Sequence, residues 1–113
     1  MRAIHYAGED ILTGTDIADA VLSYAQALAE TESSATVEIP VIGTGGQVVA
    51  STFLLGPSSQ LIAVELPDYE GEEISDPELV AELEELTAQL KRPVGRALPS
   101  ESVMDSQILD EIT

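Results

Sequence analysis

The strongest structural signal in this sequence is a stripe of leucines in its last third. They are spaced by four, three and four residues: Leu79, Leu83, Leu86 and Leu90. This spacing places all four on one side of an α helix. Asp76 and Pro77 precede the stripe, and an Asp cap followed by Pro in the first turn is typical of a helix start. Pro93 cannot continue a helix, so the pattern predicts a helix that starts at Pro77 and ends before Pro93.

A second helix is predicted over residues 16–30. Its apolar positions also repeat at four, three and four residues: Ile17, Val21, Tyr24 and Leu28. Five alanines in the same stretch raise its helix propensity. Residues 13–16 have the sequence Thr-Gly-Thr-Asp, which fits a capping box, with Thr15 and Asp16 as alternative caps.

Residues 36–66, between the two helices, predict a β-meander of three strands. Residues 37–41 alternate apolar and polar side chains, and Pro40 places this strand at a sheet edge because proline has no N–H to donate. The second strand, 48–55, and the third, 61–66, are separated by a turn at 56–59. Both are apolar on both faces, so we expect one apolar sheet face that the two helices do not cover.

Residues 3–7 and 11–13 permit a hairpin that turns at Gly8 and Glu9. The order of elements then predicts an α+β fold, with a mainly antiparallel sheet and two amphipathic helices on one face. We expect residues 1–93 to form this single domain. Residues 94–113 are expected to be a tail whose pattern permits a short helix.

The charge balance excludes several classes of protein. The chain has 21 acidic residues and four basic ones, counting Lys and Arg together, and its net charge is −17. No Lys or Arg lies between Arg2 and Lys91. Binding to nucleic acid or to an anionic membrane surface needs clustered basic residues, so neither is expected. The sequence has no apolar run long enough for a membrane span, no signal-peptide pattern at its start and no cysteine. We therefore expect a cytoplasmic protein.

No motif in the sequence predicts catalysis, a metal or a cofactor. His5 is the only histidine, and nothing in the sequence assigns it a partner, so we expect it at the surface or half-buried. Residues 43–46, Gly-Thr-Gly-Gly, precede a strand rather than a helix, which favours a hairpin loop over a phosphate site. The acidic residues 68–76 do not have the spacing of a calcium loop and predict a solvated acidic loop.

The sequence therefore predicts a small acidic protein-interaction module, such as a regulator, inhibitor or adaptor, whose charge would attract a basic protein partner. The candidate partner-binding residues come from an apolar stripe in the tail and from the acidic loop: Met104, Ile108, Leu109, Ile112, Glu70, Glu72 and Glu73. The tail stripe resembles a helix that binds in a groove, and docking on the chain's own sheet is the alternative. An uncovered apolar sheet face predicts a homodimer that forms through the sheet.

Two other interpretations of the chain remain open. The acidity could serve only solubility, or it could imitate a nucleic acid in the basic groove of another protein. The chain could also be an enzyme or a small-ligand-binding protein with a pocket between sheet and helices. A structure distinguishes this last class by the polar groups that converge in such a pocket.

Overall fold

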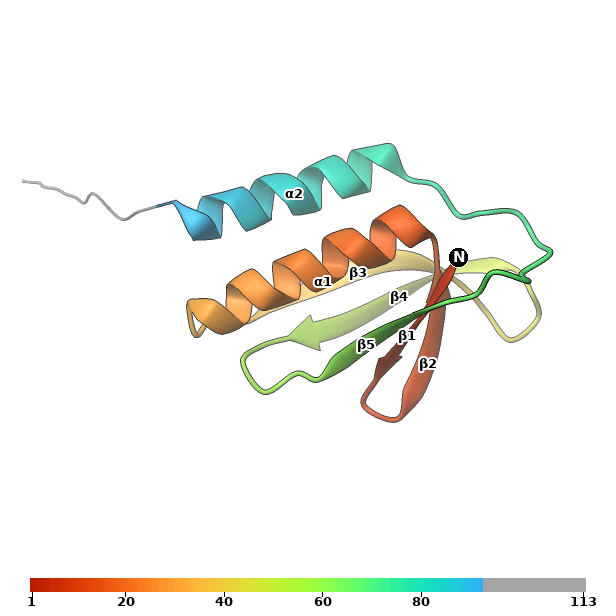
Figure 1. Cartoon of the computed structure of the whole chain (residues 1–113), viewed down its shortest axis with the longest axis horizontal. Coiled ribbons are helices and arrows are strands. Elements are labelled where there is room, and N and C mark those ends of the chain that lie inside the picture. Colours follow the sequence, from red (N-terminus) through yellow and green to blue (C-terminus); the bar gives the residue numbers. More distant parts are fainter. Residues whose placement is uncertain (93–113) are drawn as a thin grey trace, which may run out of the picture.

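The computed structural model of this chain describes residues 1–92 and contains five strands and two helices (Figure 1). In chain order the elements are β1 (Arg2–Tyr6), β2 (Glu9–Thr13), α1 (Thr15–Glu30), β3 (Ala35–Ile42), β4 (Val48–Leu55), β5 (Leu61–Glu65) and α2 (Pro77–Lys91). The two helices lie side by side along one side of the strands. The predicted class, an α+β fold with antiparallel pairing, is confirmed. The tail predicted over 94–113 lies outside the described residues.

The strands form two antiparallel sheets rather than one. One sheet has the order β2-β1-β5, and the other pairs β3 with β4. The N-terminal hairpin is present as predicted, but the three-strand meander is wrong in its last strand, because β5 pairs with β1 and not with β4. The hydroxyl of Tyr6 donates to the carbonyl of Leu54 at the end of β4 where β5 would have to join it. The β1–β5 ladder continues instead to Leu66, whose N–H donates to the Met1 carbonyl at 3.0 Å.

Pro40 explains why β3 pairs with one strand only. At the β3–β4 turn, the Gly43 N–H donates to the Gln47 carbonyl at 2.7 Å. Because peptide groups alternate along an antiparallel pair, the odd-numbered residues of β3 bond to β4 and Pro40 faces away. Its missing N–H therefore costs no bond to β4. Its carbonyl accepts from the Thr13 hydroxyl at 2.7 Å, which joins the two sheets without a ladder. The predicted edge position of this strand is confirmed.

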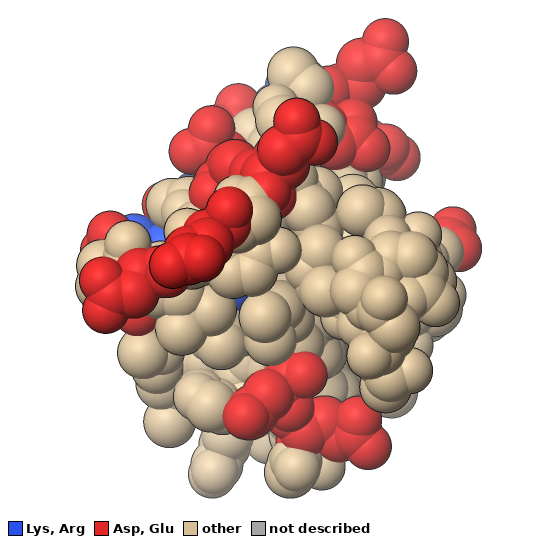
Figure 2. Space-filling view, turned by 90° about the vertical axis from the view of Figure 1, so that its right-hand side faces the viewer, with Lys and Arg blue, Asp and Glu red and all other residues tan. Residues whose placement is uncertain are grey.

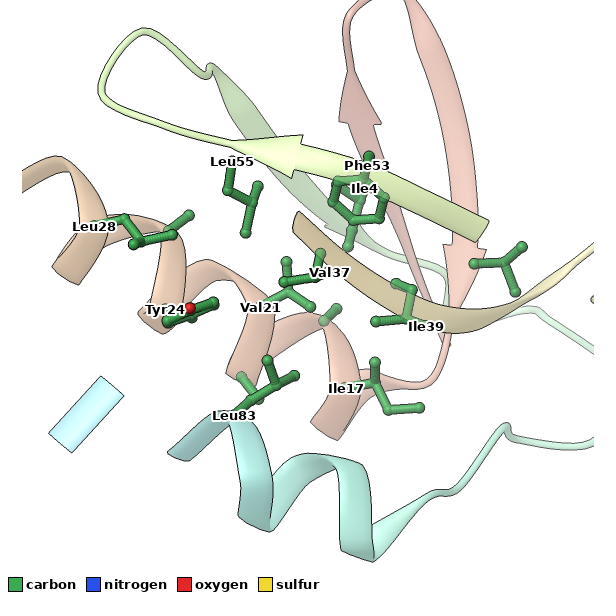
Figure 3. Close-up of a cluster of buried hydrophobic side chains, with 14 residues drawn as sticks. Ile4, Ile17, Val21, Tyr24, Leu28, Val37, Ile39, Phe53, Leu55 and Leu83 are labelled. Atoms are coloured by element: carbon green, nitrogen blue, oxygen red, sulfur yellow. The ribbon is translucent and has the colours of Figure 1, made fainter. Parts of the chain in front are cut away.

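The core lies between α1 and the inner faces of both sheets (Figure 3). Outside α2, large aliphatic side chains with at most 2% exposure come from α1 and from strands β1, β3 and β4, and include Ile4, Ile17, Val21, Leu28, Ile39 and Leu55. From the leucine stripe of α2, Leu83 is fully buried, and the other three pack on the core from its margin. The predicted amphipathic faces of both helices are therefore the faces that the structure buries.

Candidate interaction surfaces

Exposed acidic side chains cover α2 and the loop that precedes it, residues 66–76. We call this set the acidic surface, and it comprises Asp68, Glu70, Glu72, Glu78, Glu82, Glu84 and Glu85. Figure 2 shows acidic side chains over the upper part of the molecule, where α2 and this loop lie in Figure 1. Within the described residues, only Glu85 of this set has a cationic partner, Arg92 at 3.7 Å. The negative charge of the acidic surface is therefore largely uncompensated.

Glu73, in the middle of the same loop, has a different environment. One carboxylate oxygen accepts from the Met1 ammonium at 2.6 Å, and the other accepts from the Thr15 backbone N–H, also at 2.6 Å. The hydrogen bond from the ammonium, followed by that from Thr15, lowers the pKa of Glu73 below its usual range. Thr15 is the first residue of α1, so a carboxylate lies at the positive end of the helix dipole.

This arrangement replaces the capping box that the sequence predicts for α1. The N-cap residue is Gly14, which has no side chain to accept a hydrogen bond. Thr13, the predicted cap, instead donates its hydroxyl to Pro40. The capping box is therefore wrong: Glu73, from the loop before α2, supplies the oxygen that local sequence fails to provide. By contrast, the predicted cap of α2 is confirmed, because the Asp76 carboxylate accepts from the Leu79 N–H at 3.2 Å.

Gly14 also lets the acidic loop approach the start of α1 closely. A Cβ atom at this position would lie 1.9 Å from the Ile74 carbonyl oxygen, which is far inside van der Waals contact. The Ile74 N–H in turn lies 3.5 Å from the Met1 sulfur. Residues 73 and 74 are thus fixed to the fold through backbone and side chain, while Glu70 and Glu72 remain exposed.

The second surface is uncharged and lies on the strands. Val48 and Leu54 of β4 are 59% and 57% exposed, and Ile62 of β5 is 62% exposed. β4 has no charged residue along its whole length. In Figure 2 a largely uncharged expanse separates the upper acidic side chains from a smaller group at the bottom, where the β1–β2 turn lies in Figure 1. The uncovered apolar side chains that the sequence predicts for these two strands are therefore present.

A groove of about 750 Å³ lies where β4 and β5 diverge. Leu54 and Ile62 line it together with the 56–60 loop, and His5 and Tyr6 line its β1 side. The His5 ring nitrogen Nδ1 is hydrogen bonded to the carboxylate of Asp10, which faces it across the β1–β2 pair. No local pattern in the sequence indicated this partner, although a hairpin that pairs residue 4 with residue 11 places Asp10 opposite His5.

The structure places the predicted partner-binding residues unevenly. Glu70 and Glu72 lie exposed in the loop, and Glu73 faces the start of α1 while keeping half of its side chain exposed. Met104, Ile108, Leu109 and Ile112 lie outside the described residues. Whether any of these residues binds a partner remains a prediction.

Over residues 1–92, no cluster of histidine and acidic side chains has the geometry to hold a metal ion. Neither described helix is both long and apolar enough to cross a membrane. Comparisons with protein-family models, with curated proteins and with solved structures found no match to this chain.

Proposed function

We propose that this chain is a small acidic protein-interaction module, a regulator, inhibitor or adaptor that binds a basic protein through its acidic surface. The observation that carries the proposal is the separation of its exposed side chains. The acids gather on α2 and on the 66–76 loop, whereas β4 carries no charge and exposes aliphatic side chains. Such a division provides one surface that attracts a positively charged partner and another that suits apolar contact.

The lack of counter-charges supports a basic partner. The chain has no Lys or Arg between Arg2 and Lys91. The negative charge of nearly all acids on this surface is therefore not neutralised by a basic side chain. Fields of one sign accelerate encounter with an oppositely charged protein and weaken as salt is added. A partner that binds here should therefore associate quickly and dissociate in salt.

The test compares two double variants that each remove two negative charges. Glu70→Gln with Glu72→Gln changes the acidic loop. Glu30→Gln with Glu32→Gln changes the last residue of α1 and the turn that follows it, and removes the same amount of charge. Each immobilised chain is exposed to an extract of the source cells at about 0.15 M salt, and retained proteins are identified by mass spectrometry. We expect basic proteins that elute as salt rises toward about 0.5 M, retained several-fold less by the loop variant only. Equal retention by both variants, or no basic protein retained, would contradict the proposal.

The module is also proposed to be a homodimer that forms through its sheets. Val48, Leu54 and Ile62 are large aliphatic side chains left in water, and β4 contains no acid to repel a second copy. Light scattering at micromolar concentration and about 0.15 M salt should give twice the 11.9 kDa of one chain. A mass of one chain would remove this part of the proposal and leave the acidic surface unaffected.

A second candidate function is the binding of a small ligand in the groove between β4 and β5. The observation in its favour is the His5–Asp10 pair, whose ring and carboxylate lie at a groove that Ile62 lines with an apolar side chain. A ligand bound there should shift the NMR signals of His5 and Tyr6, and Ile62→Asp should abolish the shifts. A compound screen that leaves those signals unchanged would remove this candidate.

A further inference from the structure

The backbone groups that lie along the free edge of β4 can be identified from two hydrogen bonds near the ends of the strand. The Leu54 carbonyl accepts a hydrogen bond from the Tyr6 hydroxyl, so the peptide groups of Leu54 point away from β3. The Gly43–Gln47 bond at the turn leads to the same alternation from the opposite end of the hairpin. The N–H and C=O groups of Val48, Ala50 and Thr52 therefore also point away from β3. Within residues 1–92 they have no backbone partner, because β4 pairs with β3 alone.

This edge lacks the features that protect the other edges. β3 presents Pro40, β2 carries two acids at its start, and β5 is five residues long and ends in Glu65. β4 has eight residues, with no proline and no charge. Its first residues are also exposed on both faces, since Val48 points to one face at 59% exposure and Val49 to the other at 38%. Another strand can therefore approach residues 48–52 of this edge, which lie away from the Leu54 end that Tyr6 contacts.

We infer that the free edge of β4 pairs antiparallel with β4 of a second copy of this chain, which joins the two β3–β4 hairpins into one continuous four-stranded sheet. The inference rests on the proposed homodimer and specifies its contact as a strand edge. The charge distribution selects the occupant. Each copy carries −17, and β4 is a long edge that itself contributes no acid to a contact between two copies; the nearest acids, Glu38 and Asp76, lie beside its first residues and not on the strand. A basic partner gains nothing from this neutral edge and is drawn to the acidic surface instead.

The free groups are arranged symmetrically for such a pairing. The Leu54 carbonyl already accepts from the Tyr6 hydroxyl. Within residues 1–92, the residues of this edge whose N–H and C=O both lack a backbone partner are therefore Val48, Ala50 and Thr52. Ala50 lies at their centre. A two-fold axis beside Ala50 therefore sets each Val48 opposite the Thr52 of the other copy and forms about six new backbone hydrogen bonds.

Ala50→Pro tests the pairing, because it removes an N–H that points to the open side and costs no bond to β3. The matched control is Thr36→Pro on β3, which also removes an N–H that faces away from the hairpin partner. A second variant, Ala50→Glu, leaves the backbone unchanged and sets two carboxylates against each other across the axis. Sedimentation equilibrium of the full chain from about 1 to 100 μM gives the dimer constant, and circular dichroism verifies that each variant folds.

We expect the wild type and Thr36→Pro to dimerise alike, and both Ala50 variants to raise the dissociation constant at least tenfold. A wild-type dimer that both Ala50 variants leave intact would overturn the edge pairing, while the proposed homodimer would stand with another contact. A wild type that remains monomeric over the whole range would overturn both. If Ala50→Pro does not fold, the result with Ala50→Glu decides.

Discussion

The acidic loop 66–76 and strand β4 both carry exposed residues, but they differ in charge and in how they are bound to the rest of the fold. The loop has five acids, and its centre is fixed by Glu73 at the start of α1 and by the contact of Ile74 with Gly14. β4 has no charge, and within residues 1–92 the peptide groups of Val48, Ala50 and Thr52 have no backbone partner along one edge.

Negative charge therefore does not show which exposed segment of this molecule is free to bind a partner. A carboxylate in the most acidic segment has a structural role, because it compensates for a glycine cap 59 residues earlier in the chain. The neutral strand, which by composition belongs in a core, keeps unused hydrogen-bonding capacity. Substitutions can disturb one of these two regions while leaving the other unchanged.

The largest effect is expected from Gly14→Ala. The new methyl group would meet the Ile74 carbonyl oxygen at 1.9 Å, so the loop has to move and Glu73 loses its place at α1. We expect a loss of about 3 kcal/mol in the free energy of unfolding, measured by urea denaturation, from overpacking together with the lost cap. Gly56→Ala is the control, since its Cβ would lie 3.4 Å from Ser34, and it should change stability little. Equal losses in the two variants would show that the loop is not held at Gly14.

Glu73→Gln is expected to destabilise the chain at neutral pH, whereas Glu72→Gln, one residue away, should not. The pKa of Glu73 is lower in the folded chain than in the unfolded one, so its carboxylate stabilises the fold above its ordinary pKa of about 4.3. That stability is lost as pH falls through the lower folded value. Because Glu73 is half exposed, we expect a loss below about 1 kcal/mol at pH 7, which disappears in acid. A difference between the two variants that grows below pH 4 would contradict this assignment.

A smaller effect is expected from salt. Residues 65–85 carry ten acids and no Lys or Arg, and among them only Glu73 and Glu85 have described cationic partners. Salt of about 0.5 M screens the repulsion between the others, so the melting temperature should rise by a few degrees from low salt. The variant Glu70→Gln with Glu72→Gln should show a smaller rise than the wild type. A melting temperature that falls or stays flat with salt would mean that the acids do not repel one another appreciably.

The sequence predicted both helices and the three strands within residues 36–66, and it permitted the two strands of the N-terminal hairpin, because these signals are local. The Leu79–Leu90 stripe, the Asp76 cap and the alternation around Pro40 each depend on neighbours within a few residues. The pairing of β5 was not predictable in this way. β1 and β5 are joined by contacts such as Met1 with Leu66, and the segments on either side of the 56–59 turn are equally apolar, so periodicity favoured a simple meander.

The sequence predicted which residue types the candidate surfaces contain, but not the structural role of each residue. The acids of the loop were evident, yet Glu73 reaches Thr15 across 58 residues, a separation at which no spacing rule applies. The exposed aliphatic residues of β4 and β5 follow from apolar character on both faces of each strand. Which edge is free depends on Pro40 and on the Tyr6 hydroxyl, whose positions are set by tertiary packing.

Hydrogen exchange of single amides in β4, followed by NMR at two protein concentrations, tests most directly whether the neutral edge is the open surface. At a few micromolar, we expect slow exchange at Ser51 and Phe53, which bond to β3, and fast exchange at Ala50 and Thr52. At hundreds of micromolar, Ala50 and Thr52 should become slow as well, while Ser51 and Phe53 change little. Uniform protection along β4 in dilute solution would contradict an open edge, and Ala50 and Thr52 amides that exchange fast at every concentration would contradict its pairing with a second copy.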